Sequence, residues 1–271
     1  LELRTVECFN GFTAKQLGSG ATHVALSDKS RKSAFTIDES LTHVAHCDKS
    51  RRVAFTLAEV LITLGIIGVV AALTLPSVIV NYQKKVTVEK LKKAFSTFSQ
   101  GLVQSQAENG NASEWKVPIR NSSYNDNLAY FEKYWKPYLK VIKICETMKD
   151  CGYKQTFLKD IKGGRHAYLI QPKNVPGFIY GDGTYAYIRP YSFDTTLMQE
   201  LQILCLDLNG AKSPNIIGKD IFFFQIDIKN NVLKTMGNVR NCTKDRFVDA
   251  GRACAGKIIQ DGWQIKDDYP W

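Results

Sequence analysis

The feature that most constrains this chain is a long apolar run, FTLAEVLITLGIIGVVAALTL, at positions 55–75, in which Glu59 is the only ionisable residue. A helix of this length measures about 30 Å, which matches the hydrocarbon core of a bilayer. No other apolar run in the sequence is half as long. We therefore predict a leader over residues 1–54, a transmembrane helix over residues 55–80 and an extracytoplasmic domain over residues 81–271.

Glu59 lies about one helical turn inside this run. A carboxylate at such a depth costs about 2.5–3.5 kcal/mol on insertion scales, so it normally has a partner. A positively charged group at the same depth would supply one. The alternative is a side chain that reaches back to the interface from near the helix end.

The start of the apolar run resembles the type IV prepilin signature. Basic residues precede Ala54, and Phe55-Thr-Leu-Ala-Glu59 follows it. In that family a membrane peptidase cuts before the Phe and methylates it, which leaves Glu as the fifth residue. Here Ala54 replaces the usual Gly, and Ala58 stands where a larger aliphatic residue is common. Pro76 falls where pilins often carry a helix-kinking proline.

The resemblance implies a structural subunit, not an enzyme. It would reside in the inner (cytoplasmic) membrane with a single span and an extracytoplasmic C-terminal domain. Its partners would be prepilin peptidase, other pilin or pseudopilin subunits and an inner-membrane assembly platform. The product would be a type II secretion pseudopilus or a type IV pilus-like filament, in which Glu59 of one subunit meets the Phe55 ammonium of its neighbour.

Three other interpretations remain open. One is a secretory signal peptide cut near Ala71-Ala72, although its apolar segment would be unusually long. Another is a single-span surface binding protein or adhesin that does not polymerise. A third is a minor pilin for DNA uptake. Lysines after the span, among them Lys84 and Lys85, outnumber the charges before it, so counting positive charges does not settle the topology.

Residues 1–54 contain an internal repeat, because THVA, DKSR, AFT and Glu each recur twenty residues later. Only the second copy continues into an apolar run. We interpret the first copy as a duplicated leader segment that is disordered or removed, since two copies are too few for a solenoid.

The chain has a formal net charge of +10, most of it in residues 55–271. A basic domain could contact nucleic acid, anionic lipid or an acidic polymer. Because no basic cluster is interleaved with aromatic residues, a solvated surface is favoured over these partners.

Beyond Pro76 a helical period resumes and runs to about residue 107. Its apolar stripe lies opposite a lysine-rich face and is predicted to dock on a sheet, since the heptads end too soon for a coiled coil. The stripe consists of Val88, Leu91, Phe95, Phe98 and Leu102. The predicted fold class is α+β, with a long N-terminal helix on an antiparallel sheet, as in pilins.

The segment after this helix predicts a second helix and then strands. The helix covers residues 128–142, and its aromatic residues are expected to be core rather than a platform for nucleic acid. Strand patterns follow at residues 167–171, 178–180, 184–188, 202–208, 221–228 and 232–233. The C-terminal residues predict a short helix followed by Gly262-Trp263, with Trp263 packing that end onto the sheet.

Residues 207–222 resemble a D-x-N-G-x-x-x-P-N-x-x-G-x-D-x-F segment common in pilin-like and pseudopilin domains. Asp207, Asn209 and Asp220 could offer oxygen ligands to Ca²⁺. The spacing does not match an EF-hand loop. Asx turns around a proline-stiffened crossover explain the same residues and are favoured, and no other cofactor is expected.

Five cysteines lie outside the leader, in a domain expected to be exported and therefore oxidised. Their spacing predicts two short loops, closed by Cys145 with Cys151 and by Cys242 with Cys254. Cys205 would then be a buried free thiol in a strand. Zinc is not favoured, because neither a C-x-x-C motif nor a nearby His accompanies these residues.

No catalytic motif is recognisable in the sequence. His166 is the only histidine outside the leader, and neither a G-x-S-x-G motif nor a phosphate-binding loop occurs. The residues Lys162-Gly163-Gly164-Arg165 are interpreted as a turn rather than a nucleotide cradle.

The processing hypothesis predicts the behaviour of two variants at Ala54. Ala54→Gly should speed the conversion of precursor to mature chain and Ala54→Leu should block it, since the peptidase is expected to accept only a small residue there. Pulse-chase labelling and gel mobility measure the conversion. Deleting residues 1–41 should change neither export nor processing, and a deletion that abolishes export would refute our interpretation of the repeat.

Overall fold

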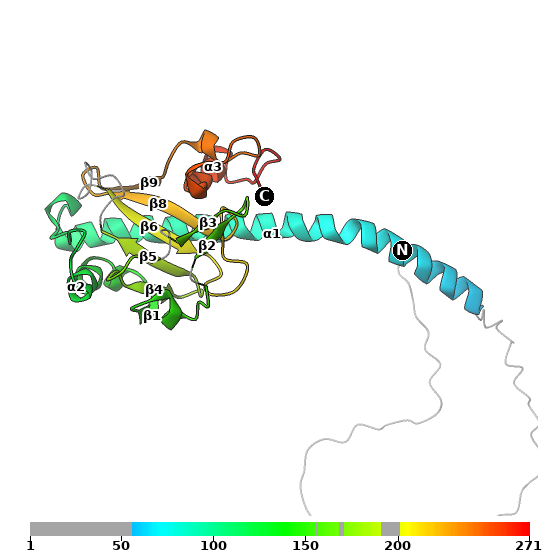
Figure 1. Ribbon diagram of the computed structural model, residues 1–271, viewed down its shortest axis with the longest axis horizontal. Helices are drawn as coiled ribbons and strands as arrows, with labels where there is room; N and C mark the ends of the chain where they lie inside the picture. The colour runs from blue at the N-terminus through cyan, green and yellow to red at the C-terminus, as the bar shows by residue number, and fades with distance from the viewer. Residues whose placement is uncertain (1–55, 156, 168–170, 191–200) are drawn as a thin grey trace, which may run out of the picture. The chain divides into compact units, whose positions relative to one another are not determined.

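The computed structural model describes residues 56–155, 157–167, 171–190 and 201–271. The leader and the predicted cleavage point between Ala54 and Phe55 lie outside these residues. The described part is an α+β fold in which one long helix, α1, packs by its C-terminal half against a large mixed sheet (Figure 1).

Helix α1 (Leu57–Asn109) is continuous over 53 residues, so the predicted span and amphipathic helix are one element. Pro76 lies inside it without ending it. The helix ends at Asn109, two residues beyond the predicted end near residue 107. Gly110 caps it, with a φ of 76° in the left-handed region that glycine adopts at little cost.

The two halves of α1 have opposite environments. The predicted stripe is buried at Val88, Leu91, Phe98 and Leu102, while Phe95 is partly buried. Residues 57–70 and 72–83 are exposed, although most of those before residue 81 are apolar. The domain therefore uses only the C-terminal half of α1 as part of its core.

Nine strands form the sheet in the described residues, in the order β1-β4-β5-β6-β8-β7-β2-β3, with β9 also paired to β8. Their bounds are β1 Val141–Cys145, β2 Leu158–Asp160, β3 Arg165–His166, β4 Gly177–Tyr180, β5 Tyr185–Arg189, β6 Leu201–Asp207, β7 Ile216–Ile217, β8 Ile221–Asp227 and β9 Val232–Thr235.

The sheet is not purely antiparallel, which corrects the prediction. The strands β1, β4, β5, β6, β8 and β9 are joined by antiparallel pairings, but β7 runs parallel to both β8 and β2. The cause is local. The Asp220 carboxylate accepts hydrogen bonds from the backbone N–H groups of Asn215 and Ile216, which holds β7 beside the start of β8.

Both faces of the central strands are buried. Along β8, Phe222 and Phe224 face the core that contains α1, whereas Phe223 faces a second apolar cluster on the other side. This follows from the two-residue period of a strand. Cys205 belongs to the second cluster, which is covered partly by the segment that contains Tyr153.

The predicted helix over residues 128–142 is wrong in its bounds. Helix α2 spans Tyr124–Tyr134, a short 3-10 turn with Pro137 follows, and Val141 and Ile142 begin β1. The aromatic residues are core, as expected. Trp115 stacks on Tyr134 with ring centroids 4.5 Å apart, and Phe131 stacks on Phe178 at 4.4 Å.

The C-terminal segment is anchored by helix α3 (Cys254–Gln260) and the residues after it. Trp263 packs edge-on against Phe95 of α1 at 5.8 Å, so its contact is with the helix that covers the sheet. The ammonium of Lys257 lies 2.6 Å from Asp261 and 2.7 Å from Asp268. These contacts hold the last residues of the chain near α1 (Figure 1).

Both predicted disulfides are present. Cys145–Cys151 closes the loop after β1, and Cys242–Cys254 joins the segment before α3 to its first turn. Cys205 is a buried free thiol, as expected.

The second disulfide predicts a local effect on proteolysis. A bridge that closes about a dozen residues contributes about 2–4 kcal/mol. Lys244 and Arg246 are exposed, but the bridge restrains the backbone around them. The double variant Cys242→Ser/Cys254→Ser should therefore speed tryptic cleavage after Lys244 and Arg246 while β8 stays protected, as measured by timed digestion and mass spectrometry. The matched variant Cys145→Ser/Cys151→Ser should leave cleavage at these two sites unchanged, and equal sensitivity in both would contradict a local role.

Candidate functional site

The first turn of α1 is fixed by a reciprocal capping box. The backbone N–H of Glu59 donates to Thr56 Oγ1 at 3.2 Å, and the backbone N–H and hydroxyl of Thr56 both donate to Glu59 Oε2 at 2.8 Å. Such a box satisfies helix N–H groups that would otherwise have no partner. Glu59 thus has a partner within its own chain, which the sequence analysis did not anticipate.

After this turn the helix presents an exposed apolar surface. Of the described helices, α1 alone is long and apolar enough to cross a membrane. Its apolar residues 57–80 would extend about 36 Å at 1.5 Å per residue, slightly more than the hydrocarbon core of a bilayer. Large side chains along it, such as Leu57 and Leu73, are 81% and 76% exposed.

Pro76 removes one backbone N–H from the helix ladder within this segment. Hydroxyl groups close by bond to neighbouring backbone carbonyls. Thr74 Oγ1 donates to the Val70 carbonyl at 2.9 Å, and Ser77 Oγ donates to the Thr74 carbonyl at 2.9 Å. These bonds keep both hydroxyls satisfied in a segment that could lie in lipid.

Several lysines of α1 lie where the helix enters the domain. Lys93 forms an ion pair with Asp182 at 3.0 Å, and Lys90 Nζ donates to the Leu208 carbonyl at 3.3 Å. Among the described residues, Lys84 and Lys85 form no ion pair with a carboxylate.

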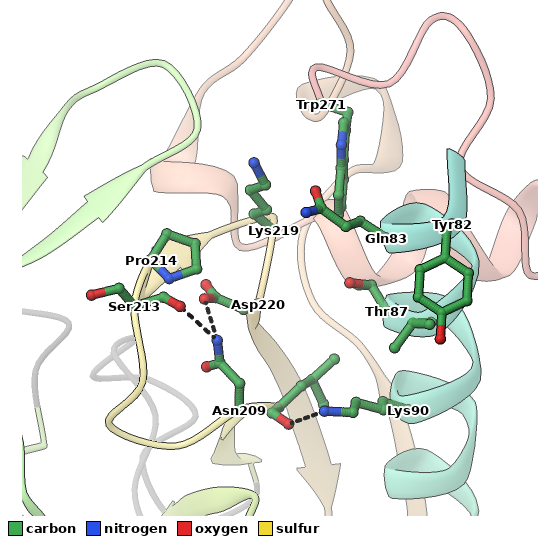
Figure 2. A pocket seen from close by; sticks show the side chains of 12 residues that line it. Tyr82, Gln83, Thr87, Lys90, Asn209, Ser213, Pro214, Lys219, Asp220 and Trp271 are labelled. Carbon is green, nitrogen blue, oxygen red and sulfur yellow. Dashed lines mark hydrogen bonds between the residues drawn. The ribbon is translucent and has the colours of Figure 1, made fainter. Parts of the chain in front are cut away.

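A cleft of about 360 Å³ lies at this entry point. Its walls are the start of the domain-bound half of α1, the loop between β6 and β8, and Trp271 (Figure 2). Lys219 Nζ lies 5.2 Å from the centre of the Trp271 ring, within the range of a cation–π contact.

The structure brings together the three residues proposed for calcium, but as a hydrogen-bonded clamp. The amide nitrogen of Asn209 donates to Asp220 Oδ2 at 3.2 Å, and Asp207 Oδ2 accepts from the Tyr153 hydroxyl at 2.7 Å. N–H and O–H donors thus occupy the carboxylate oxygens that a cation would need. This geometry favours the turn-forming role over cation ligation.

Burial, reinforced by the neighbouring Asp220 carboxyl, raises the pKa of Asp207 well above its ordinary value. Burial also raises the pKa of Asp220, although the N–H groups of Ile216 and Asn215 oppose the shift. Both carboxyls thus hold their protons more tightly in the folded chain than in free solution.

His166 lies at a turn, beside the carboxylate of Asp160. His166 Nε2 lies 2.6 Å from Asp160 Oδ2, while the backbone N–H groups of Lys162 and Gly164 donate to Asp160 Oδ1. The interpretation of residues 162–165 as a turn is thus confirmed. Within the described ranges, no group of three or more His, Cys, Asp or Glu residues could hold a metal ion.

Sequence reasoning missed two features of this region. The capping box was visible as T-x-x-E at residues 56–59, a spacing that predicts reciprocal hydrogen bonds. The cleft was not visible, because it joins Gln83, Lys219 and Trp271 from three distant parts of the chain.

The fold and this region define an α+β domain carried on a helix that could cross a membrane. A profile of a family of unknown function, DUF6613, matches residues 77–271, and the chain belongs to this family. The match begins one residue after Pro76 and covers the domain-bound half of α1 and all that follows. No curated protein and no solved structure matches the chain.

The buried carboxyl pair predicts a measurable pH dependence. A carboxyl whose pKa is raised on folding binds its proton more tightly in the folded state, so the free energy of unfolding falls as pH rises above 3.8, its ordinary value. Asp207→Asn should remove this contribution, so the wild type should lose stability more steeply than the variant as pH rises. Urea unfolding of the full chain in neutral detergent at a series of pH values measures this. Asp267→Asn, at an exposed position, is the control, and parallel curves for wild type and Asp207→Asn would exclude the effect.

Proposed function

We propose that this protein is a pilin-like or pseudopilin-like subunit that assembles into a filament of the type IV pilus or type II secretion kind. The observation that carries the proposal is the division of α1 into a domain-bound half and an exposed apolar half that begins at a prepilin-like sequence. The described residues of the chain leave that apolar half exposed. A bilayer can cover it before assembly, and the same halves of other copies can cover it afterwards.

In the proposed cycle the leader is removed after Ala54 by prepilin peptidase, which leaves Phe55 as a methylated N-terminus. The mature subunit stays in the inner membrane by α1, with its C-terminal domain extracytoplasmic. An assembly platform in that membrane then adds it to the growing filament.

Glu59 has two roles in this proposal. Within one chain it caps α1 through Thr56 at 2.8 Å. Between chains its carboxylate pairs with the Phe55 ammonium of a neighbouring subunit. A charged pair is strongly favoured in an apolar surrounding, where an unpaired charge is costly.

The intramolecular cap also favours a second candidate function. Because Glu59 already accepts two hydrogen bonds from Thr56, an intermolecular partner is not obligatory. A single-span, membrane-anchored binding protein that does not polymerise would need only this local arrangement. Its ligand would bind the domain, whose family has no assigned function.

Two variants separate these candidates. Glu59→Gln keeps a side chain that suits a capping box but removes the charge, whereas Thr56→Ala removes the cap but keeps the charge. If the charge pairs subunits, Glu59→Gln should reduce the yield of sheared filaments at least ten-fold with unchanged membrane insertion, and Thr56→Ala should reduce it far less. Sheared fractions and membrane fractions are compared by immunoblot.

The opposite ranking would mean that the helix cap, not the charge, is what assembly requires. Equal, undiminished filament yield from both variants would remove the argument for pairing between Glu59 and Phe55.

A further inference from the structure

The cleft where α1 enters the domain is lined by hydrogen-bond donors, several of which have no acceptor among the described residues. The side chains of Gln83, Thr87 and Ser213 make no hydrogen bond to any part of the chain that the structure describes, and all three line the cleft (Figure 2). Lys90 and Lys219 line it as well and form no ion pair with a described carboxylate. Five donor side chains, two of them cationic, therefore meet in one hollow.

The one carboxylate in the cleft lining is already occupied by hydrogen-bond donors. Asp220 is the one acidic side chain in its lining, and its carboxylate accepts from the backbone N–H groups of Asn215 and Ile216 and from the Asn209 amide. A cation would find no free carboxylate there. The complementary ligand is an anion with several acceptor oxygens, which is the chemistry of a phosphate group.

The position of the cleft along α1 indicates where such a phosphate would come from. At 1.5 Å per residue, Tyr82 and Gln83 lie about 3–5 Å beyond Val80, the last residue of the apolar segment. This is the depth of the headgroup region when the apolar segment crosses a bilayer. Tyr82 and Trp271 add the aromatic side chains that are typical of a membrane interface.

We propose that this cleft binds the phosphate of an anionic phospholipid, with Lys219 and Lys90 as its cationic contacts and Trp271 as its aromatic wall. Lipid binding in this cleft requires that α1 spans a bilayer, but it does not require that the protein assembles into a filament. Its failure would leave the filament proposal intact, and the loss of filaments would leave this inference intact.

Lipid retention by the full chain tests the proposal. The protein is placed in nanodiscs that contain equal amounts of phosphatidylcholine and phosphatidylglycerol. Native mass spectrometry then measures which lipid stays bound when the protein is released from the nanodisc. The matched variants are Lys219→Gln and Lys212→Gln, which remove the same charge from one loop, inside and outside the cleft.

We expect the wild type to retain phosphatidylglycerol preferentially. Lys219→Gln should lower this preference about five-fold, the factor expected for one lysine near an anionic surface, while Lys212→Gln leaves it unchanged. Trp271→Ala should lower retention without altering the two disulfides, which report folding. An equal loss in the two lysine variants, or no loss in either, would overturn a specific site.

Two further experiments test whether the cleft holds a lipid phosphate, a free phosphate ion or a second copy of the chain. Inorganic phosphate, added at the same concentration of phosphate groups, should not displace the lipid, because the bilayer holds the lipid at a high local concentration. Displacement by inorganic phosphate would overturn the lipid assignment. A dimer that excludes phosphatidylglycerol would likewise overturn it, in favour of a second copy seated in the cleft.

Discussion

The structure depends on one constraint: α1 carries more apolar surface than its own domain buries. The C-terminal half supplies Leu91, Phe98 and Leu102 to the core, where each is at most 1% exposed. The apolar side chains of the N-terminal half remain exposed among the described residues. Burial of apolar surface is the main favourable term in folding and association, so this half requires a bilayer or other protein chains around it.

The domain that packs around the C-terminal half of α1 is held together by contacts within the chain. Its central strands are buried on both faces, and disulfides fix the loop after β1 and the segment before α3. Hydrogen bonds to the Asp220 carboxylate hold β7 beside β8, and the Lys257 ion pairs hold the chain's last residues. The cleft lies where the β6–β8 loop and the C-terminal residues approach α1, so its shape depends on the hydrogen bonds to Asp220 and on the ion pairs of Lys257.

Long elements were predictable from the sequence because their patterns repeat many times. The apolar run, the stripe at Val88 to Leu102 and the strands β6 and β8 all gave correct elements. Strands β2, β3 and β7 have two or three residues, too few for a period, and β7 is held by Asp220 rather than by pattern. The predicted second helix extends beyond α2 because Pro137 interrupts a helix and the β-branched residues Val141 and Ile142 favour a strand. The cysteine pairs were predictable from spacing, whereas the cleft joins distant residues and gave no local signal.

The account's central claim is that the apolar half of α1 is a mature filament helix, not a retained anchor or a removed signal. The most direct measurement is the mass of the N-terminal peptide of the protein extracted from its native membrane. The claim predicts a chain that begins at Phe55 with one added methyl group on its α-amine. A chain that still carries its leader, or one that begins near Ala72, would contradict it.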